Sequence, residues 1–161
     1  MKGALLVGVI TIMFACKNEQ EKSGQEKTGE VVVIDKEKIK EEIQAKEDEF
    51  AATYNSGVLK NIGYYADEAV SFYPNRAPLV GKEAIVAFLV ADLEANSNTI
   101  MYKTNEVFVS SDGNMVVELG NFKLIDSTKT TINTGNYMSL FEKRNGKYVC
   151  VRDMSASVMP N

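Results

Sequence analysis

Residues 64–88, YYADEAVSFYPNRAPLVGKEAIVAF, predict a strand, a turn and a helix in close succession. The strand is expected at 69–74, where β-branched and aromatic residues are concentrated. The segment from Asn75 to Pro78 carries the residue types that favour a turn. A helix is expected to begin after Gly81, because apolar residues then recur at helical spacing. The apolar face of that helix consists of Ile85, Phe88, Leu89 and Leu93.

A long amphipathic helix is expected before this stretch, between an N-cap at Asp35 and a stop at Gly57. Its apolar residues, at spacings of four, seven and four, share one face. They are Ile39, Ile43, Phe50 and Tyr54. The charged run KEKIKEEIQAKEDE is expected to form the solvated face of the same helix. A short second helix is predicted over VLKNIGYY, residues 58–65.

The remainder of the chain has the pattern of strands. Runs rich in β-branched and aromatic residues are separated by the turn signals SDGN, DSTK and RNGK. These runs cover residues 99–110, 114–125, 131–143 and 147–158. Helices followed by an antiparallel meander predict an α+β fold, in which the helices pack on one face of a curved sheet.

Four segments occur in an informative order: YNSGVLKNI, YADEAVSFYP, GKEAIVAF and FEKRNGKYVCVRDMSAS. This order resembles the nuclear transport factor 2-like (NTF2-like) superfamily, and within it the SnoaL-like and DUF4440 domains related to ketosteroid isomerase. The resemblance covers about residues 35–158. It implies a cone-shaped roll, in which a strongly bent, mainly antiparallel sheet wraps around three N-terminal helices and encloses a pocket.

The resemblance also implies where catalytic groups would lie. Family members that isomerise steroids use a carboxylate base just before a proline, and here that place is Tyr73, whose phenol stays protonated at neutral pH. Their late-strand acid falls near Tyr137 or Met138, neither of which is acidic. Related cyclases and dehydratases use a His and Asp pair, whereas this sequence has no histidine. The sequence therefore favours a domain without inherited catalysis.

Glu118 and Asp153 are the remaining candidates for acid–base chemistry. Each alternates along its strand with residues of one face, so each is able to point inward. A rim position or an ion pair with a cross-strand basic residue is the simpler expectation for both. If either is buried without a basic partner, its pKa should rise and it becomes the leading acid–base candidate. No metal-ligand spacing or cofactor motif is found, so neither a metal nor a cofactor is expected.

Aromatic side chains are expected to line the pocket. Tyrosine combines an apolar ring with a hydroxyl that needs a partner when buried, so several tyrosines suit a small apolar or amphipathic molecule. The ligand-pocket candidates are Tyr54, Tyr65, Tyr73, Tyr102, Phe122 and Tyr137. Asn75 and Arg76, in the turn, are either contacts for a polar end of such a molecule or ordinary loop residues.

The N-terminus predicts export and lipidation. Lys2 precedes the uncharged run GALLVGVITIMFA, which has the pattern of a secretory signal and is short for a membrane span. MFAC, ending at Cys16, resembles a bacterial lipobox, although Met13 and Phe14 depart from the usual Leu and small residue. The resemblance implies cleavage before Cys16 and acyl chains on that residue, which give stable anchoring. An uncleaved signal anchor is the alternative.

The chain is therefore divided into a signal peptide at 1–15, a lipidated Cys16 with a flexible tether at 16–34, and one domain at 35–161. Residues 17–30 have no apolar side chain, which predicts a tether or a sorting signal. The expected location is the bacterial cell envelope, with the anchor in the outer membrane or on the periplasmic face. The chain carries 18 Lys and Arg against 22 Asp and Glu and has no basic stripe, which argues against nucleic-acid binding.

Three functional interpretations follow. The favoured one is a membrane-anchored, extracytoplasmic domain that binds a small molecule without catalysis. The alternative is an isomerase- or dehydratase-like enzyme that uses Glu118 or Asp153 as the base. A third is an interaction module that forms a homodimer through the open face of the sheet. An unpaired carboxylate in a sealed cavity would favour the enzyme, a dry aromatic cavity the binding protein, and an exposed apolar sheet patch the module.

Overall fold

The structure of the protein is a computed structural model, in which residues 33–59 and 62–158 are described. The predicted signal peptide, the lipidation site Cys16 and most of the tether lie outside the described residues, so they remain predictions. The whole of the predicted domain except residues 60–61 and 159–161 is described.

The long helix α1 (Lys36–Asn55) begins and ends where the sequence predicts. Asp35 caps it, because its carboxylate accepts a hydrogen bond of 3.1 Å from the N–H of Lys38. Just beyond the helix, Gly57 has φ 75°, a conformation that favours glycine and ends the helix. The buried residues of α1 are Ile43, Glu47, Phe50 and Tyr54. One charged residue, Glu47, therefore occupies the apolar face.

The predicted short second helix is not found in the described part of its segment. Leu59 and Ile62 are buried and joined by a turn, in which the Ile62 N–H donates to the Leu59 carbonyl at 3.2 Å. Tyr64 and Tyr65 both place their rings against Phe50, with centroid separations of 4.9 and 6.0 Å. Tertiary packing of two adjacent rings thus overrides the local helical pattern. The described residues contain two helices rather than three.

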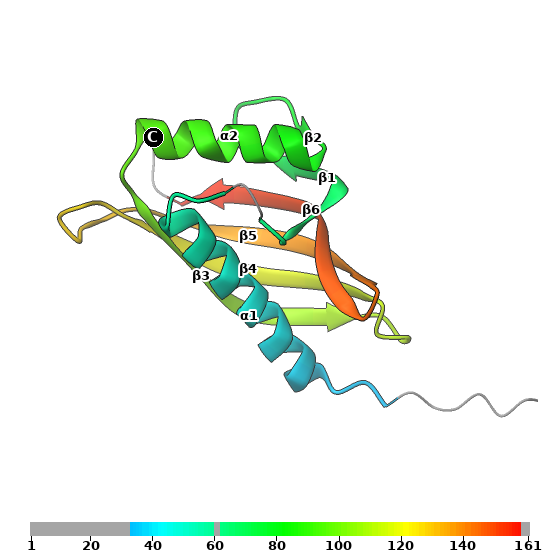
Figure 1. Ribbon diagram of the computed structural model, residues 1–161. Helices are drawn as coiled ribbons and strands as arrows, with labels where there is room; N and C mark the ends of the chain where they lie inside the picture. Colours follow the sequence, from blue (N-terminus) through cyan, green and yellow to red (C-terminus); the bar gives the residue numbers. More distant parts are fainter. Residues whose placement is uncertain (1–32, 60–61, 159–161) are drawn as a thin grey trace, which may run out of the picture. The chain divides into compact units, whose positions relative to one another are not determined.

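Six strands form one sheet in the order β2-β1-β6-β5-β4-β3 (Figure 1). The strands are β1 (Tyr65–Phe72), β2 (Leu79–Val80), β3 (Thr99–Val109), β4 (Met115–Ile125), β5 (Thr131–Arg144) and β6 (Lys147–Ser157). β1 pairs in parallel with β6, and the other pairings are antiparallel. The predicted meander is thus confirmed as β3 to β6, whereas the short edge strand β2 was not predicted.

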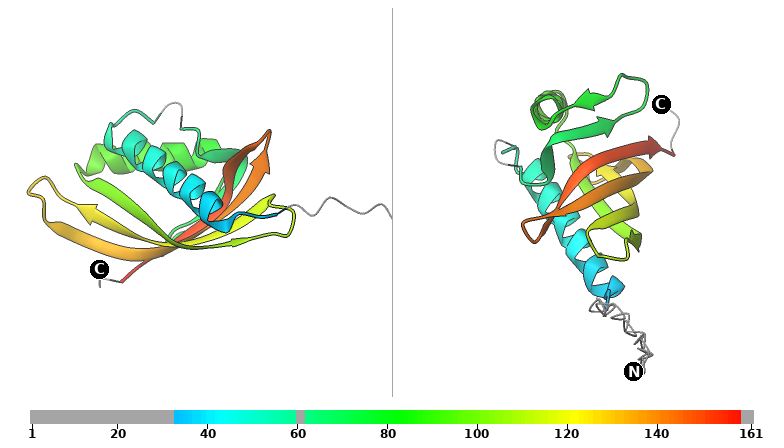
Figure 2. Two further views of the ribbon diagram at one scale, coloured as in Figure 1. Left: turned by 90° about the horizontal axis from the view of Figure 1, so that it is seen from below. Right: turned by 90° about the vertical axis from the view of Figure 1, so that its right-hand side faces the viewer.

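The helix α2 (Lys82–Ala95) follows Gly81 as predicted and buries Ile85 and Leu89. Phe88 and Leu93 are partly buried against the same core. Both helices lie on one side of the sheet, and Figure 2 shows the sheet bending around them. This arrangement confirms the α+β fold. Within the described residues, neither helix has the length and apolarity needed to cross a membrane.

The bend of the sheet is accompanied by irregular pairing in its long strands. The register shifts between Thr104 and Glu106 on β3, and between Leu140 and Phe141 on β5. Such bulges bend a strand and increase its local twist. The concave face that results holds the cavities described next.

Candidate functional site

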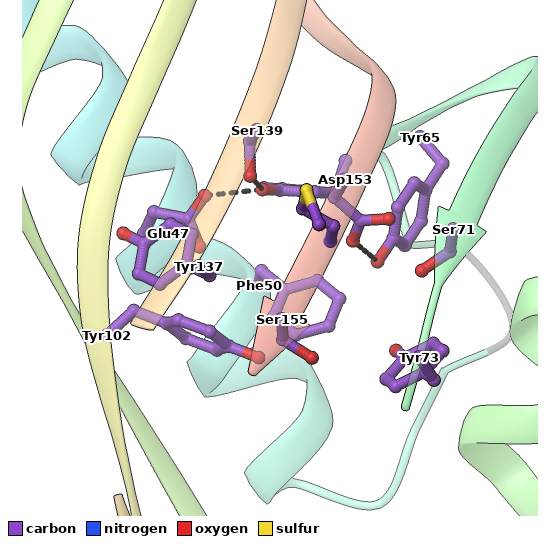
Figure 3. A pocket seen from close by; sticks show the side chains of 12 residues that line it. Glu47, Phe50, Tyr65, Ser71, Tyr73, Tyr102, Tyr137, Ser139, Asp153 and Ser155 are labelled. Atoms are coloured by element: carbon purple, nitrogen blue, oxygen red, sulfur yellow. Dashed lines mark hydrogen bonds between the residues drawn. The ribbon is translucent and has the colours of Figure 1, made fainter. Parts of the chain in front are cut away.

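Two adjoining cavities lie between α1 and the concave face of the sheet. The outer cavity has a volume of about 770 Å³ and the inner cavity about 30 Å³. Figure 3 shows the residues of the inner cavity. Four residues line both cavities: Phe50, Tyr73, Tyr102 and Ser155. The inner cavity is therefore a small extension of the outer one.

The six aromatic residues predicted to line a pocket all lie on these cavities. Tyr54 and Phe122 line the outer cavity, Tyr65 and Tyr137 the inner one, and Tyr73 and Tyr102 both. Several rings contact one another edge to face, as between Tyr102 and Tyr137, whose centroids are 5.1 Å apart. The walls are thus largely aromatic, with hydroxyl groups as their polar points.

The turn after β1 contributes polar residues to the outer cavity. Asn75 and Arg76 both line it, as the sequence analysis considered. The Arg76 guanidinium lies 4.2 Å from the centre of the Phe88 ring, a cation–π contact. One turn after Phe88 on α2, Asp92 accepts a hydrogen bond from the Tyr54 hydroxyl. The outer cavity therefore carries one basic and one acidic side chain among its aromatic residues.

Two buried glutamates, Glu47 from α1 and Glu118 from β4, form what we call the acid pair, and Glu47 lines the inner cavity. Their exposed fractions are 1% and 0%. The Tyr64 hydroxyl donates to Glu47, and Thr104 and Tyr137 donate to Oε1 of Glu118 at 2.5 and 2.7 Å. None of the ion pairs found in the described residues involves either glutamate.

Burial disfavours the ionised form of both members of the acid pair. Burial raises the pKa of Glu47 well above its ordinary value, and the negative charge of Glu118 raises it further. Burial also raises the pKa of Glu118. Oε2 of Glu118 has no hydrogen-bond partner among the described residues while both acids are ionised. A proton on Glu47 would supply the donor, because the hydrogen bond between the two acids raises the pKa of Glu47 and lowers that of Glu118.

Asp153 on β6 presents a carboxyl group to the inner cavity (Figure 3). Its Oδ2 accepts a hydrogen bond of 2.9 Å from the Tyr65 hydroxyl. Its Oδ1 is buried and has no hydrogen-bond partner in the described part of the chain. Burial raises the pKa of Asp153, while the hydroxyls of Ser71, its cross-strand neighbour, and of Tyr65 lower it by stabilising the ionised carboxyl. The Ser71 hydroxyl lies near the carboxyl but makes no hydrogen bond to Oδ1. One acceptor atom of Asp153 is thus left without a donor.

The expectation that Glu118 and Asp153 lie at the rim or form ion pairs is wrong. The cross-strand neighbours of Asp153 are Ser71 and Ser139, which carry no charge. The adjacent Arg152 instead donates to the backbone carbonyl of Val151 at 2.5 Å. Glu118 is therefore fully buried without a basic partner. Asp153 is partly buried, with its Oδ1 enclosed, and it too lacks a basic partner.

Tyr73, in the place of the family's base, is a wall residue. Its ring packs against Phe88 with a centroid separation of 4.6 Å. Burial, and then the charge of Asp153, raise the pKa of Tyr73 above its ordinary value. Its hydroxyl can therefore donate a hydrogen bond at neutral pH but cannot act as a base. At the late-strand place, Tyr137 bonds Glu118 and Met138 is 43% exposed.

Glu47 was missed by the sequence analysis, which assigned it to the solvated face of α1. The signal was present, because Glu47 lies four residues after Ile43 and three before Phe50, the spacing of one helix face. The charge run around it concealed this spacing. A charged residue on the apolar face of a helix is rarely fully buried unless another group pairs with it. Such a position in a sequence is therefore a candidate for a functional or structural acid.

The other reactive groups near the cavities are few. Cys150 is buried, and burial raises the pKa of its thiol, which makes it a weak nucleophile. Among residues 33–59 and 62–158, no group of three or more His, Cys, Asp or Glu side chains is arranged to hold a metal ion. The titratable groups that line the cavities are mainly carboxyls and phenols.

Solved structures share this fold. An NTF2-like protein with a cystatin-like fold from Novosphingobium aromaticivorans aligns with a TM-score of 0.65 at 16% identity, over 75% of this chain and 82% of that one. A ketosteroid isomerase-like protein from Erwinia carotovora atroseptica aligns with a TM-score of 0.60 at 17% identity, over 74% of this chain and 96% of that one. An NTF-2 like protein of unknown function from Shewanella oneidensis aligns with a TM-score of 0.61 at 18% identity, over 71% of this chain and 96% of that one.

These comparisons define the fold as that of NTF2-like, ketosteroid isomerase-like proteins with a cystatin-like fold. No protein-family model matches the sequence, and no curated protein matches it. Identities of this size establish the fold alone.

Proposed function

We propose that this domain, of the SnoaL-like type, binds a small apolar or amphipathic molecule in the outer cavity. The observation that carries the proposal is a cavity of about 770 Å³ lined by aromatic rings and continuous with a smaller polar cavity. Small-molecule sites commonly have this size, with mostly apolar walls and a few polar groups that orient the ligand. Such binding uses only the aromatic rings and polar side chains that line the two cavities.

The test is to fill the cavity. Ser155 lines both cavities, so Ser155→Trp should block them. Met101→Trp is the matched control, because Met101 is 54% exposed and precedes the cavity residue Tyr102 on β3. Small molecules extracted from the purified proteins are identified by mass spectrometry. We expect a molecule that copurifies with the wild type and Met101→Trp and is lost from Ser155→Trp; equal recovery from all three would contradict the proposal.

Acid–base catalysis is a second candidate, favoured by the partnerless Oδ1 of Asp153. In that case ionised Asp153 would take a proton from carbon beside a substrate carbonyl, and a tyrosine hydroxyl would stabilise the enolate oxygen. Glu118 is less suited, because Thr104 and Tyr137 already occupy one of its oxygens.

The catalytic candidate is tested by incubating acetonaphthone with the protein in heavy water and following its methyl signal by NMR. Catalysis predicts exchange of methyl protons for deuterons that is faster than in buffer and is lost in Asp153→Asn. Exchange at the buffer rate would leave binding as the function.

The proposal places the domain at the bacterial cell envelope, held through lipid on Cys16. It is supported by the apolar run before MFAC and the polar run after it. Metabolic labelling with a fatty acid should label the wild type and not Cys16→Ala. Equal labelling of the two would remove the anchor.

A homodimer through the sheet is supported by an apolar row of cross-strand neighbours, of which Met154 also borders the inner cavity. Phe72, Met154, Met138 and Leu119 are successive cross-strand neighbours. The first three are 43%, 52% and 43% exposed. A two-fold dimer would bring this row against its own copy. Light scattering should report a dimer that dissociates in Met138→Glu but not in the exposed control Lys147→Glu; a monomeric wild type would contradict it.

A further inference from the structure

The inner cavity contains one buried acceptor atom that lacks a donor. Oδ1 of Asp153 is buried without a donor, and the Tyr65 hydroxyl has already used its proton on Oδ2. A buried acceptor without a donor is unfavourable, and more so when it is charged. A ligand that supplies a proton to Oδ1 would remove this cost, whereas a ligand that offers only an acceptor, such as a carbonyl oxygen, would not.

The charges around Asp153 favour a cation over a neutral donor. The acidic side chains lining the inner cavity are Asp153 and Glu47, and no Lys or Arg is among its lining residues. Glu47 is close enough to Asp153 for the charge of Asp153 to raise its pKa, and with Glu47 protonated the acid pair still carries the negative charge of Glu118. Arg76 lines only the outer cavity, where it stacks on Phe88. A positive group would therefore meet attraction without a competing basic side chain.

The aromatic walls of the inner cavity also favour the binding of a cation. Phe50, Tyr65, Tyr73 and Tyr102 line the inner cavity. The faces of aromatic rings attract cations, and the attraction is stronger when water is excluded. An ammonium group in this cavity would thus interact with both a carboxylate and rings.

The sizes of the two cavities fit a ligand that has a small polar head group and a larger apolar body. The inner cavity, about 30 Å³, has room for about one water-sized group, which is the size of a primary ammonium. The outer cavity, about 770 Å³, has room for a drug-sized apolar body. The two share Phe50, Tyr73 and Tyr102, so one molecule can reach from the outer into the inner cavity.

We propose that the ligand is a primary amine with an apolar body, whose ammonium group lies in the inner cavity and donates to Oδ1 of Asp153. This inference rests on the proposed binding function, because it names the chemical class of the molecule that enters the same cavity. Asp153 is the residue that determines specificity, and the rings of the outer cavity hold the body.

Three probes of equal shape test the head group: naphthylmethylamine, naphthalenemethanol and naphthoate, substituted at the same ring position. Calorimetry on the purified full-length chain at neutral pH gives their affinities. Asp153→Asn removes the charge with little change in shape. Asp67→Asn is the matched control, because Asp67 is exposed on β1 and its loss changes the net charge equally.

The amine should bind the wild type and Asp67→Asn at least about tenfold more tightly than the alcohol, as expected for a hydrogen bond to a charged group. Naphthoate should bind most weakly. In Asp153→Asn the preference for the amine should fall to about one. Equal binding of amine and alcohol to the wild type, or an unchanged preference in Asp153→Asn, would overturn the inference and leave the binding pocket standing. Failure of all three probes to bind the wild type, or equal binding to Ser155→Trp, would overturn the pocket and the inference together.

Discussion

The acid pair and Asp153 place the same functional group in two different settings. Glu47 and Glu118 are surrounded by donors: Tyr64, Thr104 and Tyr137 bond them, and a proton on Glu47, whose pKa is raised, would serve the remaining oxygen of Glu118. The carboxyl of Asp153 is bonded at one oxygen by Tyr65 and lacks a donor at the other.

The difference shows that burial and a raised pKa do not by themselves identify a functional acid. Burial raises the pKa of Glu47, Glu118 and Asp153 alike. What separates them is hydrogen bonding, because a satisfied network stabilises one arrangement of the core, whereas an unsatisfied acceptor is available to a ligand. We therefore assign a structural role to the acid pair and a binding role to Asp153.

The largest effect is expected from breaking the network of the acid pair through Gly120→Ala. A Cβ at Gly120 would lie 2.3 Å from Cζ and 2.4 Å from the hydroxyl oxygen of Tyr137, so the ring must shift and its bond to Glu118 is lost. We expect the free energy of unfolding to fall by about 2–3 kcal/mol in urea denaturation. Gly63→Ala is the control, because nothing lies within 4 Å of a Cβ there. Equal losses in the two variants would contradict this account of the network.

A smaller effect is expected from removing the titratable carboxyl of Glu47 in Glu47→Gln. Because the pKa of Glu47 is raised from its ordinary 4.5, its stabilising contribution is fully present below that pH and is lost as pH rises through the raised value. The wild type should therefore lose stability as pH rises above this ordinary value, and Glu47→Gln should lose less. At alkaline pH we expect the variant to be more stable by about 1–2 kcal/mol.

Thermal melts across this pH range provide the measurement. Some slope should remain in the variant, since the raised pKa of Asp153 acts in the same direction. The exposed acids Glu68 and Asp112, whose pKa values are lowered to about 2, contribute only at more acidic pH. Parallel pH profiles for the wild type and Glu47→Gln would show that Glu47 holds no proton in the folded state.

Asp153→Asn should leave stability nearly unchanged, within about 1 kcal/mol at neutral pH. The asparagine can still accept a hydrogen bond from Tyr65, and it removes a buried charge without a basic partner. Melting temperatures are measured with and without naphthylmethylamine. The amine should raise the melting temperature of the wild type and not that of the variant. A large loss of stability in the variant alone would assign Asp153 a structural role.

The smallest effect is expected at Glu49, two residues from Glu47 on the same helix. Its carboxylate lies 3.3 Å from the Lys46 ammonium and its side chain is 63% exposed. Exposed pairs contribute little, so Glu49→Gln should change the free energy of unfolding by less than about 0.5 kcal/mol. A pH profile altered as much as that of Glu47→Gln would show that net charge, not burial, sets the behaviour of Glu47.

Local patterns in the sequence predicted the long elements well. Asp35 and Gly57 fixed the limits of α1 because capping depends on single residues. The meander followed from its β-branched runs and turns. The parallel pairing of β1 with β6 and the strand at Tyr65 were not predictable, since both depend on contacts between residues far apart in the chain.

The candidate site was only partly predictable. Its aromatic walls were predicted, because aromatic residues on these segments have few other places to be buried. The positions of the acids were not predictable. Register and bend decide whether the carboxyl of Asp153 lies beside the adjacent Arg152 or faces a serine on the next strand. Glu47 shows the same limit, since its charge concealed its place on the apolar face of α1.

The partnerless oxygen of Asp153 is tested most directly by a crystal structure of the protein with naphthylmethylamine. We predict that the amine nitrogen lies in the inner cavity about 2.8 Å from Oδ1 of Asp153, as in other charge-assisted bonds, with the naphthyl rings in the outer cavity. An amine bound at Asp92 or on the outside of the sheet, with Oδ1 of Asp153 bonded only to water, would contradict the account.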